Sequence, residues 1–472
     1  MTTIPSSKRA YALDALRGFA ILSMVLSGTI AYKILPAWMY HAQVPPPDHV
    51  FNSKLPGLTW VDLVFPIFLF SMGAAIPLAL SRRLAKGLPR SEIILSIFKR
   101  GFLLGAFAII LQHLRPQVIN PNEPSMQKWQ IALVGFFLLF FMFVRLPASW
   151  KPWRRNAITL TAWIATIFLL SRIQYPDNSG FSLSRSDIIL VILANMAVFG
   201  SLIWLFTRQN TFLRVGLLGL LFALHLSSTA DGWVAQLWSY SPAPWIFKFA
   251  YLKYLFIVIP GTIAGDLIWE SMQTTEYDQK ESWQTWRFDA IVLLMLALNL
   301  ILLVGLQSRL VVETTLASAI LCLIGWFLFK HPTSATEILL NRLYSFGILW
   351  LALGLLFEPY EGGIKKDPST MSYYFVTTGM SIFILIAFTI IFDIFQKKAW
   401  LNLLIDNGQN PMIGYVGFAN LLWPILALTG WEDSIIKHTQ TPVMGFIKGV
   451  AYTLVIALIV SVFTRLKLFW RT

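Results

Sequence analysis

The stretch GLTWVDLVFPIFLFSMGAAIPLAL, from Gly57 to Leu80, decides the fold class of this chain. After Asp62 it continues to Leu80 as an apolar run without a charged residue. An α-helix needs about 20 such residues to cross the hydrocarbon core of a bilayer. Thr59 is placed to cap this helix, with Asp62 three residues later as the reciprocal acceptor. The stretch therefore predicts a membrane-spanning helix that carries a carboxylate near one end.

Similar apolar runs recur almost from end to end of the 472 residues. The chain is 56% hydrophobic and 13% charged, whereas soluble domains carry about 25% charged residues. We therefore expect an all-α, polytopic transmembrane helical bundle of about 11–14 spans, forming a single domain over residues 1–472. The candidate runs are Phe19–Leu35, Leu63–Leu80, Phe102–Leu111, Ile131–Val144, Ala157–Leu170, Ile188–Phe206, Phe212–Leu226, Tyr251–Ile268, Ala290–Leu306, Leu316–Phe329, Leu343–Phe357, Tyr374–Phe395, Met412–Leu428 and Val450–Phe463.

The positive charge of the chain has a topological explanation. The net charge is +14, and most of the 37 Lys and Arg residues fall in alternate loops, beginning with the N-terminal segment. Loops rich in Lys and Arg stay in the cytoplasm, so we expect a cytoplasmic N-terminus and no nucleic-acid partner. The single cysteine, Cys322, excludes an internal disulfide and any site built from several cysteines.

Two charged residues interrupt the first apolar segment near its start. Asp14 and Arg17 lie three residues apart and therefore on one face of a helix. One interpretation is an ion pair at the cytoplasmic interface. The other is a role in holding a charged ligand, because ionisable residues at membrane depth usually face a cavity or a partner.

Two histidines precede the Gly57–Leu80 stretch in the loop MYHAQVPPPDHV. Either His41 or His49 could accept a proton from an incoming nucleophile near neutral pH. Asp62 has a structural explanation as an acidic residue at a helix N-terminus, and it could also orient a nearby imidazole. No histidine spacing in the chain suggests a metal site.

Polar residues gather again in the last quarter of the chain. Lys365 and Lys366 occupy a loop, where they could meet phosphate groups or simply be solvated, and Thr377 follows at the entrance of the next span. Asn407 and Asn410 stand where a later helix begins, and Asn410-Pro411 fits a helix N-cap followed by Pro at the first position. An entrance this polar also suits ligand binding.

Five segments occur in the order found in one family: RGFAILSMV, GLTWVDLVFPIFLFSMGAAIPLAL, IPGTIAGDLI, MSYYFVTTGMS and NPMIGYVG. Together they resemble the transmembrane acyltransferases related to heparan-α-glucosaminide N-acetyltransferase, and specifically a bacterial-type member in the inner membrane. The resemblance implies transfer of acetyl from acetyl-CoA, as co-substrate, to the amine of an amino sugar or glycan at the outer face. It implies no metal.

The family's catalytic histidine lies in the loop before the GLTxxDLVFP block, and YHAQ matches the start of its context. His41 therefore inherits the catalytic role by resemblance, and His49, within the inserted residues 44–56, stays second. Two positions depart from the family pattern: Gly28 stands where the best-known members carry an asparagine, and Trp129–Phe137 replaces a GVLQR pattern.

On this reading His41 acts as general base or as a transient acetyl carrier, and Asp62 orients it. Asn410 and the nearby hydroxyls are candidate oxyanion or sugar contacts, while Arg17, Arg100, Lys365 or Lys366 could meet the CoA phosphates. The alternative function is transport of amino sugars or oligosaccharides without acyl transfer. The expected partners are the acceptor sugar and the lipid bilayer, and a homodimer is compatible with this reading.

Overall fold

A computed structural model describes residues 10–471, apart from 120–125, 148, 275–282 and 397. Within these ranges it contains helices and no β-strand, which confirms the all-α class. Twelve of the described segments are long and apolar enough to cross a membrane, within the predicted range. The helices of these segments are α1 Tyr11–Thr29, α2 Trp60–Ala85, α3 Arg90–His113, α5 Met126–Phe143, α7 Ile188–Thr207, α10 Leu255–Gln273, α11 Thr285–Gln307, α12 Val311–Leu328, α13 Ala335–Tyr360, α14 Met371–Phe388, α16 Pro411–Gly417 with α17 Trp423–Leu428, and α19 Pro442–Arg465.

The two remaining predicted runs are also helical. They form α6, Pro152–Arg172, and α8, Thr211–Ser227, which is 17 residues long. After α6 the chain packs against the end of α3. There the Tyr175 hydroxyl donates to the His113 carbonyl oxygen at 3.1 Å. The other helices are short: α4 Pro116–Ile119, α9 Trp233–Trp238, α15 Lys398–Gln409 and α18 Trp431–His438.

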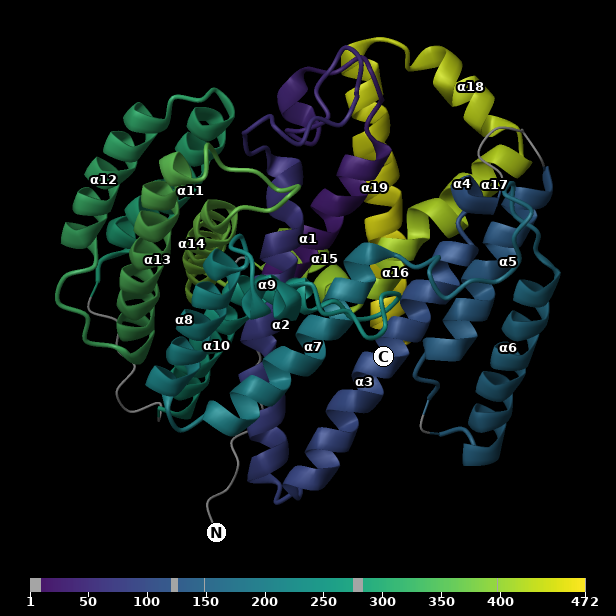
Figure 1. Ribbon diagram of the computed structural model, residues 1–472, viewed down its shortest axis with the longest axis horizontal. Coiled ribbons are helices and arrows are strands. Elements are labelled where there is room, and N and C mark those ends of the chain that lie inside the picture. Colours follow the sequence, from purple (N-terminus) through teal and green to yellow (C-terminus); the bar gives the residue numbers. More distant parts are fainter. Residues whose placement is uncertain (1–9, 120–125, 148, 275–282, 397, 472) are drawn as a thin grey trace.

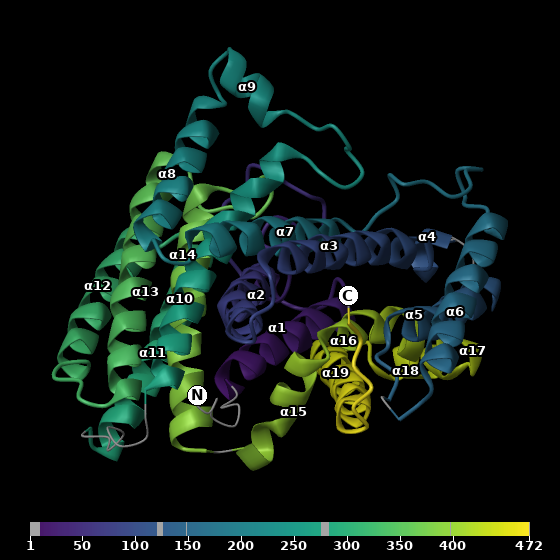
Figure 2. The same cartoon turned by 90° about the horizontal axis from the view of Figure 1, so that it is seen from below.

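α2 and α14 are the most buried spans and form the centre of the bundle. Figure 2 shows α1 and α2 between two groups of helices, one containing α8 and α10–α14 and the other containing α3–α6 and α16–α19. At the rim, α12 is the least buried of the twelve spans, as expected of a helix that faces lipid. The centre of the bundle therefore lies around α2, whose first turn carries Asp62.

Glycines allow α2 and α10 to approach closely. A Cβ added to Gly73 would overlap the Val258 carbonyl oxygen, and one added to Gly265 would overlap the Ala74 carbonyl oxygen. Gly261 lies against the backbone of α2 in the same way. Small residues at such crossings let helix backbones pack in contact within a membrane. The contact holds α2, and with it Asp62, at a fixed position.

The loops at one end of the bundle meet over the start of α2. Residues 40–58, between α1 and α2, lie at the top of Figure 1, and the loop of residues 361–370, between α13 and α14, reaches toward them. The Gly57 amide donates to the Ile364 carbonyl oxygen at 2.8 Å. We call this end of the bundle the His41 end, and the opposite end, where α1 begins, the Arg17 end.

Candidate active site

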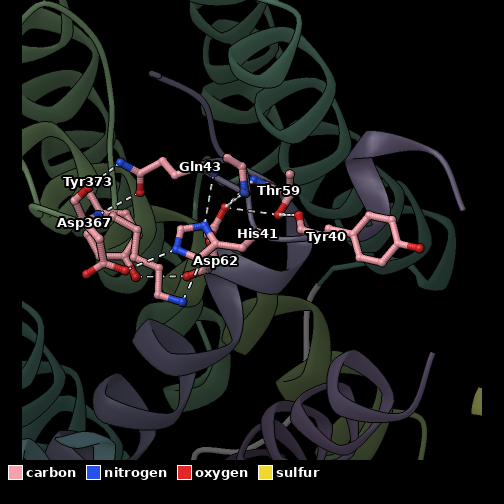
Figure 3. Close-up of polar contacts among 9 residues, drawn as sticks. Tyr40, His41, Gln43, Thr59, Asp62, Asp367 and Tyr373 are labelled. Atoms are coloured by element: carbon pink, nitrogen blue, oxygen red, sulfur yellow. Dashed lines mark hydrogen bonds and ion pairs between the residues drawn. The ribbon is translucent and has the colours of Figure 1, made fainter. Parts of the chain in front are cut away.

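His41 lies between two carboxylates at the His41 end of the bundle (Figure 3). Its Nδ1 is 2.9 Å from Asp62 Oδ1, and its Nε2 is 3.1 Å from Asp367 Oδ2. A neutral imidazole has one N–H, so it can donate to only one of these carboxylates, whereas an imidazolium donates to both. The arrangement therefore favours the protonated ring.

The start of α2 fixes Asp62. Thr59 is the N-cap residue and Asp62 is the third residue of the helix, as predicted. Asp62 Oδ2 accepts hydrogen bonds from the Thr59 amide at 3.1 Å, the Thr59 hydroxyl at 3.0 Å and the Ala42 amide at 3.1 Å. The helix dipole adds to the stabilisation of a carboxylate here. Because three donors hold Oδ2, Oδ1 is directed at His41.

The 361–370 loop completes the site with two side chains of opposite charge. Asp367 contacts the Nε2 side of His41, while the Lys366 ammonium lies 3.8 Å from Asp62 Oδ1. The Tyr373 hydroxyl, one turn into α14, donates to the Asp62 carbonyl oxygen at 2.9 Å. Residues more than 300 positions from His41 in the sequence thus form part of its surroundings.

Gln43 joins the two loops. Its side chain is fully buried, its Oε1 accepts from the Asp367 amide at 2.8 Å, and its Nε2 donates to the Asp367 carbonyl oxygen. This pairing uses both ends of the carboxamide, so it fixes the position and the orientation of the Asp367 backbone. The Asn52 amide in turn donates to the Gln43 carbonyl oxygen at 2.8 Å.

The charges around His41 determine its protonation. Burial by itself would lower the pKa of His41, but the contacts with Asp367 and Asp62 outweigh this effect and raise the pKa above its ordinary value of 6.5. The contact with His41 lowers the pKa of Asp367 below its ordinary 3.8. Both directions describe an ion pair between imidazolium and carboxylate.

His49 is not directed at Asp62. Its ring lies against Tyr32 and Tyr40, with ring centroids 4.2 and 4.7 Å away. Its two ring nitrogens are buried without a hydrogen-bond partner among the residues that the structure describes. Of the two histidines in this loop, the structure therefore brings His41 to the carboxylates.

The remaining candidates lie elsewhere. Asp14 and Arg17 form the expected i,i+3 contact, at 3.6 Å, on the first turns of α1. Arg17 also donates to the carbonyl oxygens of Gly408 at 3.3 Å and Ser71 at 3.4 Å, so it joins α1 to α15 and α2. Arg100 is exposed on α3. Arg17 and Arg100 lie on the halves of α1 and α3 nearer the Arg17 end, and no contact of either with His41 is found among the described residues.

The candidate polar residues in the last quarter of the chain also make their contacts away from His41. Asn407 and Asn410 are fully buried and donate to the carbonyl oxygens of Ala457 and Leu468, so they bind α19 and the segment after it. The Thr377 hydroxyl donates to the Tyr373 carbonyl oxygen within its own helix. The Lys365 amide donates to the Thr370 hydroxyl within the 361–370 loop. The structure brings none of these four side chains to His41 in the ranges it describes.

Sequence reasoning missed Asp367, Gln43 and Tyr373. Asp367 directly follows Lys366 in KKDPS, so the carboxylate belongs to the loop in which the sequence draws attention to the two lysines. Gln43 is two residues after His41, yet nothing in its neighbourhood indicates a partner 324 positions away. In the described ranges no group of three or more His, Cys, Asp or Glu residues could hold a metal ion.

Comparison with known proteins supplies two relationships. The profile of a family described as a domain of unknown function (DUF5009) matches residues 9–268. Heparan-alpha-glucosaminide N-acetyltransferase of Mus musculus is 31% identical over 117 residues, which cover 25% of this chain and 15% of the mouse protein. The Homo sapiens protein of the same name is 31% identical over 114 residues, which cover 24% of this chain and 14% of the human protein. The chain thus aligns with less than one sixth of either relative, a distant relationship.

Proposed function

This chain belongs to the DUF5009 family, and we propose that it is an integral membrane acetyltransferase in which His41 removes a proton from the amine of an amino sugar or glycan. Acetyl-CoA is the proposed donor, and the outer face is the proposed side of the acceptor. The observation that carries the proposal is the imidazole held between Asp62 and Asp367. The distant similarity to the mouse and human heparan-alpha-glucosaminide N-acetyltransferases supports this reaction class.

The contact with the buried Asp62 carboxylate determines which ring nitrogen of His41 can meet a substrate. Nδ1 faces the buried side of the site, 2.9 Å from Asp62 Oδ1 and 3.3 Å from the Gln43 amide, so Nε2 is the nitrogen that can exchange a proton with a substrate. A carboxylate behind the imidazole also stabilises the imidazolium formed when the ring takes up a proton. His41 is thus equipped to act as a general base, which contributes about 10²–10⁴ in rate.

The proposed donor would enter from the opposite end of the bundle. Arg17 and Arg100 lie on the first halves of α1 and α3, and guanidinium groups bind phosphate well. A small apolar cavity lies between that region and the His41 end, lined by residues that include Met24, Phe65 and Tyr415. Phe65 stands one turn after Asp62 on α2. We propose that the phosphates of CoA bind near the arginines and the acyl end reaches toward His41.

The test is acetyl transfer by the purified protein in lipid nanodiscs, with labelled acetyl-CoA and glucosamine. We expect labelled N-acetyl product from the wild type, a loss of about 10²–10⁴ in kcat for His41→Ala, and near wild-type turnover for His49→Ala. His49 is the matched control because it lies in the same loop and faces the tyrosines. Equal turnover of the wild type and His41→Ala would contradict the proposal.

Two further arms separate the alternatives. Incubation with labelled acetyl-CoA in the absence of acceptor leaves label on the protein if His41 is an acetyl carrier, and leaves none if it is only a base. Uptake of amino sugar into vesicles, without transfer to any acceptor in a broad panel, would replace the acetyltransferase by a transporter.

A further inference from the structure

The two carboxylates of the site differ in accessibility. The Asp62 side chain is 0% exposed, whereas that of Asp367 is 51% exposed. Asp62 Oδ2 already accepts three hydrogen bonds and its Oδ1 faces His41 and Lys366. Asp367 is therefore the carboxylate that a dissolved ligand can reach.

The position of Asp367 does not depend on His41. The Gln43 carboxamide holds the Asp367 backbone on both its N–H and its carbonyl oxygen. Glu361, at the start of the same loop, accepts from the amides of Met371 and Ser372 at 2.7 and 2.8 Å and so fixes the loop to α14. If the contact between Asp367 and His41 breaks, the carboxylate stays in place beside Nε2.

On the Nε2 side of His41, Asp367 is in contact with a single cationic side chain of the described residues. Lys366 is paired with Asp62 and also acts on Asp367 electrostatically, while His41 is the cationic side chain in direct contact with Asp367 among the described residues. Lys253, from the turn before α10, acts on Asp367 electrostatically but forms no ion pair within 4.0 Å of it in the described residues. The phenol groups of Tyr254, near Asp367, and of Tyr373, near both carboxylates, add no charge near neutral pH. Once His41 loses its proton, Asp367 has no cation in contact.

We propose that Asp367 binds the ammonium group of the acceptor, and that the bound ammonium takes the place of the proton on His41. The inference rests on the proposed function and names the residue that selects the acceptor. In the free protein Asp367 is neutralised by the imidazolium. In the complex it is neutralised by the substrate, which leaves a neutral imidazole next to the nitrogen that must be deprotonated.

The proton balance follows from this exchange. Binding of R–NH₃⁺ releases the His41 proton to solvent. The ammonium then gives one proton to Nε2, and as the C–N bond forms and the C–S bond of the thioester breaks, the nitrogen loses a second proton. One of these two protons neutralises the departing thiolate and the other restores the imidazolium. The acetylated nitrogen is uncharged, so the product loses its contact with Asp367 and can leave.

The experiment is calorimetric titration of glucosamine into the protein in nanodiscs, near pH 6.5 and without acetyl-CoA, in two buffers of different ionisation enthalpy. We expect release of up to one proton per glucosamine bound by the wild type. Asp367→Asn should weaken binding by about tenfold or more, the usual size of a hydrogen bond to a charged group, and should abolish proton release. N-acetylglucosamine, which lacks the ammonium, should bind at least about tenfold more weakly to the wild type.

Two variants serve as controls. Asp48→Asn removes a carboxylate from the exposed part of the same loop system and should leave binding unchanged. Asp367→Glu retains the charge and should recover part of the affinity, which a purely structural loss would not allow. Glucosamine binding of equal strength to the wild type and Asp367→Asn, or binding without proton release, would overturn the inference. The inference would also be overturned if other amino sugars bound to the wild type without releasing a proton.

Failure of this inference is distinguishable from failure of the proposed function. Acetyl transfer with an unchanged KM for glucosamine in Asp367→Asn would remove the role of Asp367 and leave the acetyltransferase. Binding that depends on Asp367 and releases a proton, without transfer to any acceptor, would leave ammonium recognition and remove the acetyltransferase.

Discussion

At the scale of single residues, His41 contacts one carboxylate from the adjoining helix and one from a distant loop. Asp62 occupies a capping position set by Thr59, and the histidine lies 21 residues earlier in the adjoining loop. The contact with Asp367 joins positions 326 apart. Its geometry depends on how two loops pack, which no local pattern of residue types encodes.

The raised pKa of His41 predicts the pH dependence of the reaction. A general base must be unprotonated, so kcat/KM should fall as the pH falls through a value above 6.5. Asp367→Asn removes a contact that raises this pKa, and the acid limb should therefore move to lower pH. A kcat/KM profile between about pH 5 and 9 measures it. An acid limb at the same pH in both proteins would contradict the assignment of that limb to His41.

The same shift contributes to stability. Because the pKa of His41 is raised in the folded protein, the imidazolium stabilises the fold fully below pH 6.5, and this contribution is lost as the pH rises through the folded pKa.

Asp62→Ala should destabilise the protein more than Asp62→Asn. Alanine leaves the amides of Thr59 and Ala42 without their acceptor in a fully buried position. An unsatisfied buried donor costs about 1–3 kcal/mol, whereas asparagine keeps an acceptor oxygen. Thermal unfolding in detergent, followed by size-exclusion chromatography, measures the difference. Equal melting temperatures of the two variants would show that the capping interactions contribute nothing measurable.

At the scale of elements, the motifs quoted for the family resemblance acquire a physical meaning. Gly73 and the glycines of IPGTIAGDLI, Gly261 and Gly265, are the residues at which α2 and α10 touch. The sequence shows small residues in two apolar runs, but it does not show that the two runs are neighbours. That information lies in the tertiary structure.

Gly261→Ala should therefore destabilise the bundle, because its Cβ would come within 2.5 Å of the Phe70 carbonyl oxygen. Overpacking of this kind costs about 1–3 kcal/mol, and it should also lower turnover by shifting the start of α2. Gly216→Ala is the matched control: it lies on an exposed face of α8, and its Cβ would meet nothing within 4 Å. Higher helix propensity should leave Gly216→Ala unchanged or slightly more stable. Equal thermal stability of the two variants would contradict the close helix crossing.

At the scale of the whole molecule, composition and run length were sufficient to predict the class and the approximate number of spans. In the part of the chain that the structure describes, twelve segments are long and apolar enough to cross a membrane, and α6 and α8 supply the other two predicted runs. Sequence could not predict which spans lie in the centre, since α2, α14 and α12 are all strongly apolar. Burial against other helices, and not hydropathy, distinguishes them.

The predicted orientation can be tested with single cysteines in a Cys322→Ala background. Asp48 and Lys86 are exposed residues in loops at opposite ends of α2. If the N-terminus is cytoplasmic, a cysteine at position 48 should react with a membrane-impermeant maleimide on intact cells, and one at position 86 only after permeabilisation. The reverse pattern would place His41 on the cytoplasmic side and remove the proposed outer-face acceptor.

The division of the site between two distant parts of the chain has a consequence for how specificity can diverge. His41 and Asp62 lie within the region matched by the family profile, residues 9–268, whereas Lys366 and Asp367 lie outside it. The proposed proton-transfer pair and the proposed acceptor-selecting carboxylate are therefore carried by separate segments. In the proposed acetyltransferase, replacing the ten residues from 361 to 370 would change the acceptor from amines to other nucleophiles and leave His41 in place. Exchange of this loop between related proteins is thus a route to new acceptors.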